Sequence, residues 1–281
     1  MKAEELIARM TDLPSISQSA TKLMGLLNGG SEHIDEVVKL VQYDTMLSAN
    51  VLRVCNSAYV GASEPVASVN QAVMLLGFNR IFSLVIAMCF GETLHRPLPG
   101  YAIREKELWE HSLATAVIAE RIALTHEVGF EPSVAFTGGL LHDIGKVVLN
   151  SILDQDCGLA VCRQIEDEGL SRDGAERQVL EIDHTVLGAT LLRQWRLPEV
   201  ILEAVEHHHE PILDPRPGLS AIVHVANCVS HEIGYAPGWH GFSIATNAET
   251  LDRLGITEEN YTGLFMESLE EIDRVKQLLK N

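Results

Sequence analysis

The residues best suited to chemistry in this chain are its histidines, of which there are 12 among 281 residues. One of them forms the pair His142-Asp143, which follows an apolar run at 138–141. An imidazole beside a carboxylate can bind a divalent metal ion when both side chains face the same cleft. His-Asp is a common dipeptide, however, and His142 could equally be a helix-end histidine bonded to Asp143 or to a backbone carbonyl.

Other polar side chains lie on helical stripes that we expect to turn inward. His111 and His184 each share a stripe with apolar residues, while His208 and His209 border the apolar side of their helix. Asn227 lies beside the apolar face of a helix expected at 220–233. Several imidazoles are costly to bury without partners, and a bound metal ion would satisfy them. We treat the remaining histidines as structural or surface residues, except for the ambiguous His207: His33, His95, His126, His224, His231 and His240.

Helices must position these side chains, because apolar residues recur at helical spacing in nearly every segment and β-alternation is hard to find. The sequence therefore predicts an all-α protein. In its second half we expect helices at 107–125, 133–150, 158–168, 175–178, 183–194, 198–210, 220–233, 247–254 and 258–280.

The first hundred residues predict a separate helical lobe. It should contain a helix stop at 28–30, a helix N-cap at Ser31 and a capping box formed by Ser68 and Gln71. A helix at 78–90 is apolar nearly all round and should be central and buried. Prolines and a glycine at 91–104 mark a junction to a second lobe, which should pack tightly on the first.

Composition excludes several classes of function. The chain carries 39 acidic against 21 basic residues, a formal net charge of −18, which repels phosphate backbones and argues against nucleic-acid binding. The longest apolar run, at 81–90, is too short to span a bilayer, and residues 1–10 lack a signal-type apolar core. The 5 cysteines are scattered, as expected of free thiols in a reducing compartment. We therefore expect a cytoplasmic protein without membrane or nucleic-acid partners.

The ordered set of polar residues resembles a known family. His111, then His142-Asp143 with Lys146, then a late polar residue at Asn227, is similar to the HD superfamily of metal-dependent phosphohydrolases. The late position in that superfamily is normally Asp. The pair His208-His209, with His184 before it, further resembles the extra ligands of the HD-GYP branch, which hydrolyses cyclic di-GMP.

The N-terminal lobe favours one branch of this superfamily. Leu13-Pro14, the stretch at 54–59 and the stretch at 68–73 ahead of Leu75-Leu76-Gly77 resemble the HDOD (HD-related output domain) family, and the match runs from about 13 to about 234. This resemblance implies a multi-helix, HD-domain-like bundle with an N-terminal helical lobe packed on it. The lobe would span 1–100, the HD-like core 101–234 and a C-terminal helical extension 235–281.

The resemblance also implies a metal site for one or two divalent ions, with iron, manganese, nickel and zinc as candidates. One ion would be held by His111, His142 and Asp143, and a second by His184, His208 and His209, with Asn227 as a weak or residual ligand. Asp143 and Lys146 would be the catalytic residues, Lys146 offsetting charge on a phosphate. The alternatives are that Lys146 is a solvated surface lysine and that His208 and His209 belong to a solvated run with His207.

Two departures bear on activity. Asn227 replaces the expected Asp, and its neutral carbonyl oxygen is a poorer ligand for a hard cation. The segment 211–218 after His209-Glu210 lacks the GYP signature. We therefore expect an HDOD signal-transduction or regulatory protein with a degenerate metal site, acting through a partner protein in trans or a small ligand such as a nucleotide. A homodimer is compatible with that role. The alternative is a metal-dependent phosphohydrolase or phosphodiesterase acting on a nucleotide or cyclic dinucleotide.

Overall fold

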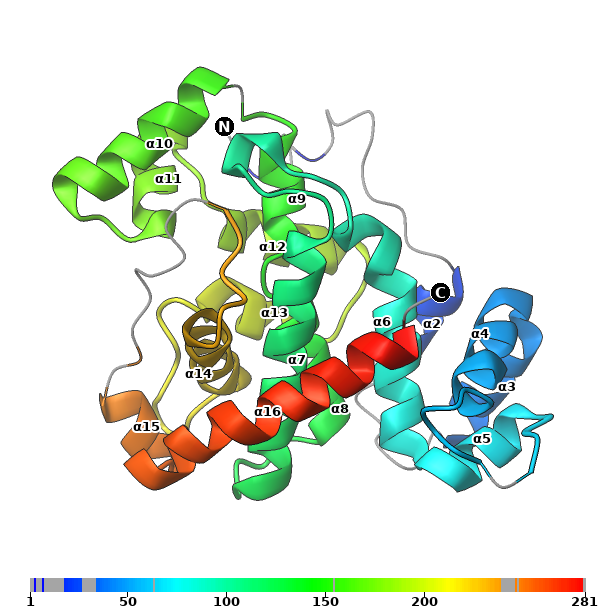
Figure 1. Cartoon of the computed structure of the whole chain (residues 1–281). Coiled ribbons are helices and arrows are strands. Elements are labelled where there is room, and N and C mark those ends of the chain that lie inside the picture. Colours follow the sequence, from blue (N-terminus) through cyan, green and yellow to red (C-terminus); the bar gives the residue numbers. More distant parts are fainter. Residues whose placement is uncertain are drawn as a thin grey trace.

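The computed structural model describes residues 3, 7, 18–26, 34–62, 64–153, 155–238, 246 and 248–279. In this part of the chain the regular elements are helices and no strand occurs (Figure 1), which confirms the predicted all-α fold. The expectations for Leu13-Pro14, the stop at 28–30, Ser31, His33 and His240 concern residues outside the described ranges.

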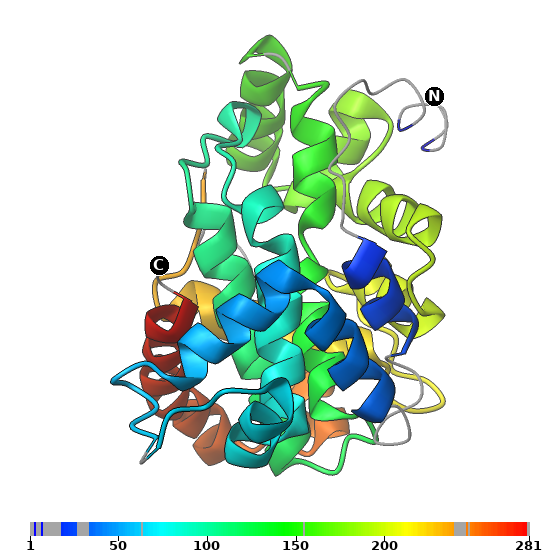
Figure 2. The ribbon, with the colours of Figure 1, turned by 90° about the vertical axis from the view of Figure 1, so that its right-hand side faces the viewer.

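Short helices form the N-terminal lobe, and two of them begin at side-chain caps. Asp44 caps one helix by accepting hydrogen bonds from the main-chain N–H groups of Met46 and Leu47, both at 3.1 Å. Ser68 and Gln71 form the predicted capping box at the start of another. Figure 2 shows these helices gathered on one side of the molecule: α2 (Gln18–Gly25), α3 (Ile34–Tyr43), α4 (Thr45–Cys55) and α5 (Val69–Leu76).

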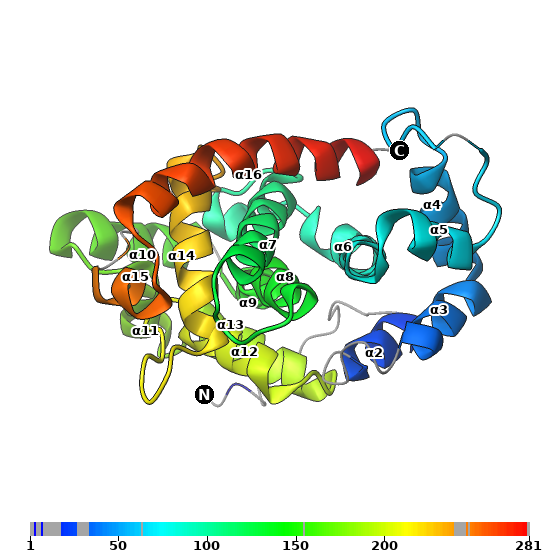
Figure 3. The ribbon, with the colours of Figure 1, turned by 90° about the horizontal axis from the view of Figure 1, so that it is seen from below.

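Helix α6 (Phe78–Leu94) lies between this lobe and the rest of the chain (Figure 3). It extends four residues beyond the predicted end at Phe90, and most of its side chains are buried, as its apolar composition indicates. In the described ranges no single helix has both the length and the apolar character needed to cross a bilayer, although the pair α5 and α6, bent by 117°, passes on those two criteria. A 3₁₀ turn, η2 (Pro99–Tyr101), follows α6 in the predicted junction.

The second lobe is built around α7, which packs against α8 and α14 (Figure 3). Its helices are α7 (Glu107–Thr125), α8 (Pro132–Leu141), α9 (Ile144–Asn150), α10 (Gln155–Glu168), α11 (Arg172–Leu180), α12 (His184–Gln194), α13 (Glu199–His207) and α14 (Leu219–Glu232). After them come α15 (Ala248–Leu254) and α16 (Glu258–Leu279), and α16 crosses α7 (Figure 1).

The single helix predicted at 133–150 is wrong, because the chain breaks into α8 and α9 at His142-Asp143. Asp143 takes φ −100° and ψ 9°, outside the helical region, in a range where active-site residues often occur. Both helices are almost wholly buried, so the apolar pattern continues through the break and does not reveal it. The short helix predicted at 175–178 is likewise longer, covering Arg172–Leu180.

Two glycines allow the helices around this break to approach closely. A Cβ on Gly139 would lie 2.8 Å from the Thr115 carbonyl oxygen, so α8 rests directly on the backbone of α7. A Cβ on Gly145 would overlap the His184 carbonyl oxygen and would lie 2.6 Å from the Gly188 nitrogen, so α9 rests on α12. The two contacts fix the His142-Asp143 segment between its neighbours.

We predict that Gly145→Ala destabilises the fold strongly, because its methyl group would meet backbone atoms that cannot rotate away. Overpacking of this kind costs about 3 kcal/mol of unfolding free energy, measurable by urea denaturation. Gly263→Ala is the matched control, since nothing lies within 4 Å of its added Cβ on α16, and it should raise stability by roughly 0.5–1 kcal/mol. Equal effects of the two changes would contradict the close approach.

A buried carboxylate, Glu120 on α7, lies where α6 and α16 meet that helix. It accepts a hydrogen bond of 2.9 Å from the Ser83 hydroxyl on α6, and Arg80 lies 3.9 Å away while pairing with Glu271 on α16. Burial raises the pKa of Glu120 to about 7, against the opposing effects of Ser83 and Arg80. Folding therefore favours the protonated carboxyl group.

We predict that Glu120→Gln removes a pH dependence of stability. Because the folded pKa lies above the unfolded one, the carboxyl stabilises the native state at about pH 4 and loses that contribution as pH rises through about 7. At about pH 8 the glutamine variant should exceed wild type by up to roughly 3 kcal/mol, with a much smaller difference at low pH. Denaturation of both proteins across this range checks the prediction, and parallel curves would contradict it.

Candidate metal centre

Side chains from four parts of the second lobe converge in its core. His111 comes from α7, His142 and Asp143 from the break between α8 and α9, His184 from the first residue of α12, and His208 from the end of α13. All five are at most 1% exposed. His209 follows His208 and is half-buried.

These residues form two groups, each with one ligand atom per residue lying within 4.8 Å of the others. The first group is His111, His142 and Asp143, and the second is His184, His208 and His209. The same two sets were inferred from the family resemblance. Such groups can bind metal ions.

The carboxylate of Asp143 faces both groups. Its Oδ2 atom lies 3.5 Å from His111 Nε2 and 3.4 Å from His142 Nε2. Its Oδ1 atom lies 3.5 Å from His184 Nε2 and 3.8 Å from His208 Nε2. Both Asp143 Oδ1 and His208 Nε2 are buried without a hydrogen bond to any described residue. Asp143 thus presents a different oxygen to each group.

Backbone carbonyls set the orientation of three of the imidazoles. His142 Nδ1 donates to the Gly139 carbonyl and His208 Nδ1 to the Val205 carbonyl, each at 2.8 Å and three residues back. His111 Nδ1 donates to the Tyr235 carbonyl at 2.7 Å. Because a carbonyl only accepts, the proton of each neutral ring lies on Nδ1, and the Nε2 lone pair is directed into the cluster.

The inward-facing nitrogens are close enough to repel one another. His111 Nε2 lies 3.2 Å from His142 Nε2, and burial lowers the pKa of both imidazoles, so both are neutral near pH 7. His184 Nε2 and His209 Nε2 are 3.1 Å apart. Ligand nitrogens about 2.1 Å from one ion lie roughly 3.0–3.4 Å from each other. The cluster therefore fits a cation between its nitrogens.

Lys146 is buried beside the same carboxylate and is not a solvated surface lysine. Its exposure is 3%, and its Nζ lies 2.5 Å from Asp143 Oδ2. Burial lowers the pKa of Lys146, and the charge of Asp143 only partly opposes this. Burial also disfavours ionisation of Asp143, but the charge of Lys146 opposes this, and the pKa of Asp143 lies well below its ordinary value. Contact of Lys146 with a phosphate stays a prediction.

On α14, Asn227 is 2% exposed, and its Oδ1 makes no hydrogen bond to a described residue. One turn further on, the ring of His231 lies 4.8 Å from that of His111, centroid to centroid, and is buried. Sequence reasoning placed His231 among structural or surface residues and so missed this contact. The signal was its place on one helical stripe with Asn227, which was visible in the sequence but was not read as a link to His111. His224 donates from Nδ1 to the His208 carbonyl at 2.8 Å, which is a structural role.

A pocket of about 210 Å³ reaches the cluster beside His209. Its lining is acidic, with four carboxylates against one guanidinium: Asp173, Asp183, Glu206, Glu210 and Arg177. Arg177 pairs with Asp173 at 2.5 Å and with Asp183 at 2.7 Å. A pocket with this balance of charge attracts cations and repels anions.

This chain matches only part of the length of its relatives among known proteins. An uncharacterised protein of Treponema pallidum (strain Nichols) is 23% identical over 210 residues, which is 74% of this chain and 39% of that protein. Ribonuclease Y of Opitutus terrae is 30% identical over 145 residues, 52% of this chain and 21% of that enzyme. The chain thus spans well under half the length of either relative.

Solved structures share the fold along nearly the whole chain. An HDOD domain protein of unknown function from Geobacter sulfurreducens aligns with a TM-score of 0.74 at 25% identity, over 99% of this chain and 97% of that one. A candidate signal transduction protein from Marinobacter aquaeolei VT8 aligns at 0.76 and 22%, over 98% and 63%. A candidate phosphohydrolase from Shewanella amazonensis SB2B aligns at 0.69 and 23%, over 97% of both.

The HDOD domain family model matches residues 13–211, which is most of the chain. This match agrees with the resemblance seen in the N-terminal lobe and with the ordered histidines of the second lobe. The chain belongs to the HDOD family.

Proposed function

We propose that this chain is an HDOD signal-transduction or regulatory protein that binds one or two divalent metal ions in its core and acts by binding a partner protein or small ligand. The main support for the metal site is the position of the Asp143 carboxylate between the two groups of histidines. One of its oxygens faces His111 and His142, and the other, without a hydrogen bond, faces His184 and His208.

The chemistry of the site supports a cation. The inward-facing Nε2 atoms of His111 and His142 are acceptors, and the Asp143 Oδ1 atom is buried without a hydrogen bond, so the site offers several lone pairs to a cation. The set is rich in imidazole, which suits zinc, iron, manganese or nickel. His111, His142 and Asp143 would hold one ion, and His184, His208 and His209 a second. Such ions, when bound, polarise phosphoryl oxygens and acidify bound water.

Access to the site favours regulation over hydrolysis. His111, His142, Asp143, His184 and His208 have almost no exposed surface, so a substrate could not contact them without a change of conformation. The pocket beside His209 has a lining that repels phosphate esters. The Marinobacter protein of the same fold is described as a candidate signal transduction protein. Binding of a partner protein in trans, of a second copy of this chain or of a nucleotide would then depend on whether the site holds metal.

A second candidate function is metal-dependent phosphoester hydrolysis of a nucleotide or cyclic dinucleotide. The specific observation in its favour is the placement of Lys146, whose ammonium contacts Asp143 inside the cluster. In that role Asp143 would hold the ion, and Lys146 would offset charge on the phosphate once the substrate had entered the site. The Shewanella protein, a candidate phosphohydrolase, shares the fold.

We predict that the protein purified without chelators contains one or two equivalents of divalent metal by elemental analysis. His142→Ala should lose the ion of the first group and His208→Ala that of the second, because each removes an inward-facing nitrogen donor. His126→Ala is the matched control, since its ring contacts Thr125 instead of the cluster. Wild-type protein that stays metal-free after incubation with each candidate ion would refute the metal site.

The same proteins separate the two functions. A regulatory protein should bind metal without turning over nucleotides or cyclic dinucleotides. Turnover by the loaded wild-type protein that disappears in His142→Ala and persists in His126→Ala would instead establish the hydrolase.

We predict that Asn227→Asp tightens metal binding by about tenfold, because a carboxylate is a better ligand for a divalent cation than an amide oxygen. Isothermal titration with Zn²⁺ and Mn²⁺ measures the change. Asn50→Asp adds the same charge on α4, far along the chain from the cluster, and should leave the affinity unchanged. Equal affinities for Asn227→Asp and wild type would place residue 227 outside the metal's reach.

A further inference from the structure

Glu176 on α11 is a fully buried carboxylate that lies outside the ligand set inferred from the family, yet it contacts a member of that set. Its Oε2 atom accepts a hydrogen bond of 2.6 Å from His184 Nδ1 and another of 2.8 Å from the His184 main-chain N–H. One oxygen thus holds both the ring and the backbone of His184.

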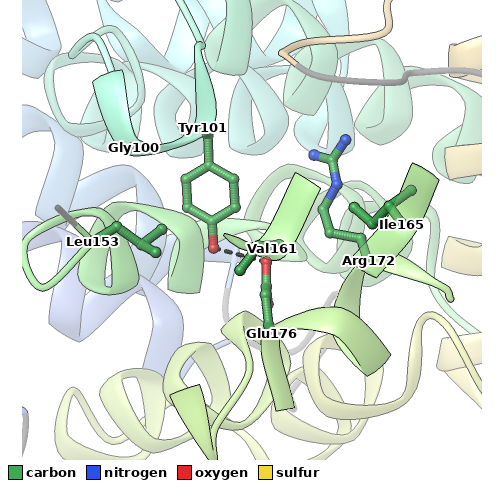
Figure 4. Close-up of a pocket in the computed structure, with 7 residues that line it drawn as sticks. All are labelled: Gly100, Tyr101, Leu153, Val161, Ile165, Arg172 and Glu176. Atoms are coloured by element: carbon green, nitrogen blue, oxygen red, sulfur yellow. Dashed lines mark hydrogen bonds between the residues drawn. The ribbon is translucent and has the colours of Figure 1, made fainter. Parts of the chain in front are cut away.

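The second oxygen of Glu176 is held by a tyrosine. Oε1 accepts a hydrogen bond of 2.9 Å from the Tyr101 hydroxyl, and the two side chains point toward each other across a small cavity (Figure 4). Burial and the charge of Glu176 raise the pKa of Tyr101 well above its ordinary value, so the phenol keeps its proton and donates. Leu153, Val161 and Ile165 line the cavity and exclude bulk water from the pair.

Tyr101 is itself fixed by its connection to α9. The preceding residue, Gly100, donates its main-chain N–H to Asn150 Oδ1 at 2.8 Å. A Cβ on Gly100 would lie 2.7 Å from Leu153 Cβ, so η2 packs tightly against the end of α9. The tyrosine therefore approaches Glu176 from a rigid support.

His184 differs from the other imidazoles in its partner. His111, His142 and His208 donate from Nδ1 to neutral carbonyl oxygens, whereas His184 donates to a carboxylate. A carboxylate behind a ligating imidazole fixes the ring and its tautomer and makes the outer nitrogen a stronger donor to a metal ion.

We propose that Glu176 is a positioning residue of the metal site, which holds His184 as the Nδ1–H tautomer with Nε2 directed at the second group, and that Tyr101 orients Glu176. This proposal rests on the proposed metal site, because its expected consequence is tighter binding of the ion held by the second group. The tautomer of His184 can be observed without any metal.

The test uses ¹⁵N-histidine-labelled full-length protein after chelator treatment, with His184 resonances assigned by their loss in His184→Gln. Long-range ¹H–¹⁵N spectra of wild type should show one fixed tautomer with the proton on Nδ1. Glu176→Ala should give mixed tautomers, and its affinity for Zn²⁺, measured by titration, should fall by about 10- to 100-fold. Tyr101→Phe should keep the tautomer and lose affinity by a smaller factor.

Two further variants separate positioning from general damage. Glu176→Gln keeps an oxygen that can accept from His184 and should restore the Nδ1–H tautomer, with an affinity between those of Glu176→Ala and wild type. Glu120→Ala removes another buried carboxylate, whose hydrogen bond goes to Ser83, and should change neither readout. A fixed tautomer and unchanged Zn²⁺ affinity in Glu176→Ala would overturn the inference while the metal site stands. Wild-type protein that refuses metal would overturn the proposed function, and the tautomer would still decide the role of Glu176.

Discussion

The structure of the second lobe depends on keeping the charged carboxylate of Asp143 in the protein core. An ionised carboxylate that is 1% exposed is tolerated only when cations and hydrogen-bond donors surround it. Lys146 supplies one cation at 2.5 Å. Four imidazoles, from three further helices and the adjacent residue, face the two oxygens. At least three of these rings present an Nε2 lone pair instead of a donor, so a cation between them and Asp143 would complete the neutralisation. The break between α8 and α9 exists at this residue, so the helices of the lobe are arranged around one buried charge.

Backbone carbonyl groups orient the imidazoles around this charge. Carbonyls at Gly139, Val205 and Tyr235 hold three imidazoles by their Nδ1 atoms, and two of these carbonyls lie in the last turn of the helix that carries the histidine. The last carbonyls of a helix lack intrahelical partners, so they are free to accept from a ring three residues on. Each helix end therefore satisfies its own backbone and aims an Nε2 atom inward at the same time.

Much of this could be predicted from the sequence, because helical periodicity and the order of the histidines are visible there. The break at His142-Asp143 was not visible, since α8 and α9 are buried on nearly every side and their apolar pattern runs on without a polar face. His231 was missed because its place on one stripe with Asn227 does not show which ring it meets on α7. Glu176 was missed for another reason: α11 is a mostly polar helix, and a single buried acid in it looks like its solvated neighbours.

The same burial limits what the site can do. The pocket beside His209 is lined by carboxylates that outnumber the guanidinium of Arg177, so it attracts cations and repels a phosphate ester. An ion in the first group would join α7 to the α8–α9 break, and an ion in the second would join α12 to the end of α13, so bound ions would stabilise one arrangement of these helices. A ligand that binds one conformation better than another shifts the population toward it. In the regulatory role that we propose, a buried ion in this lobe would therefore be better placed to set the conformation that a partner meets than to transform a substrate from solution.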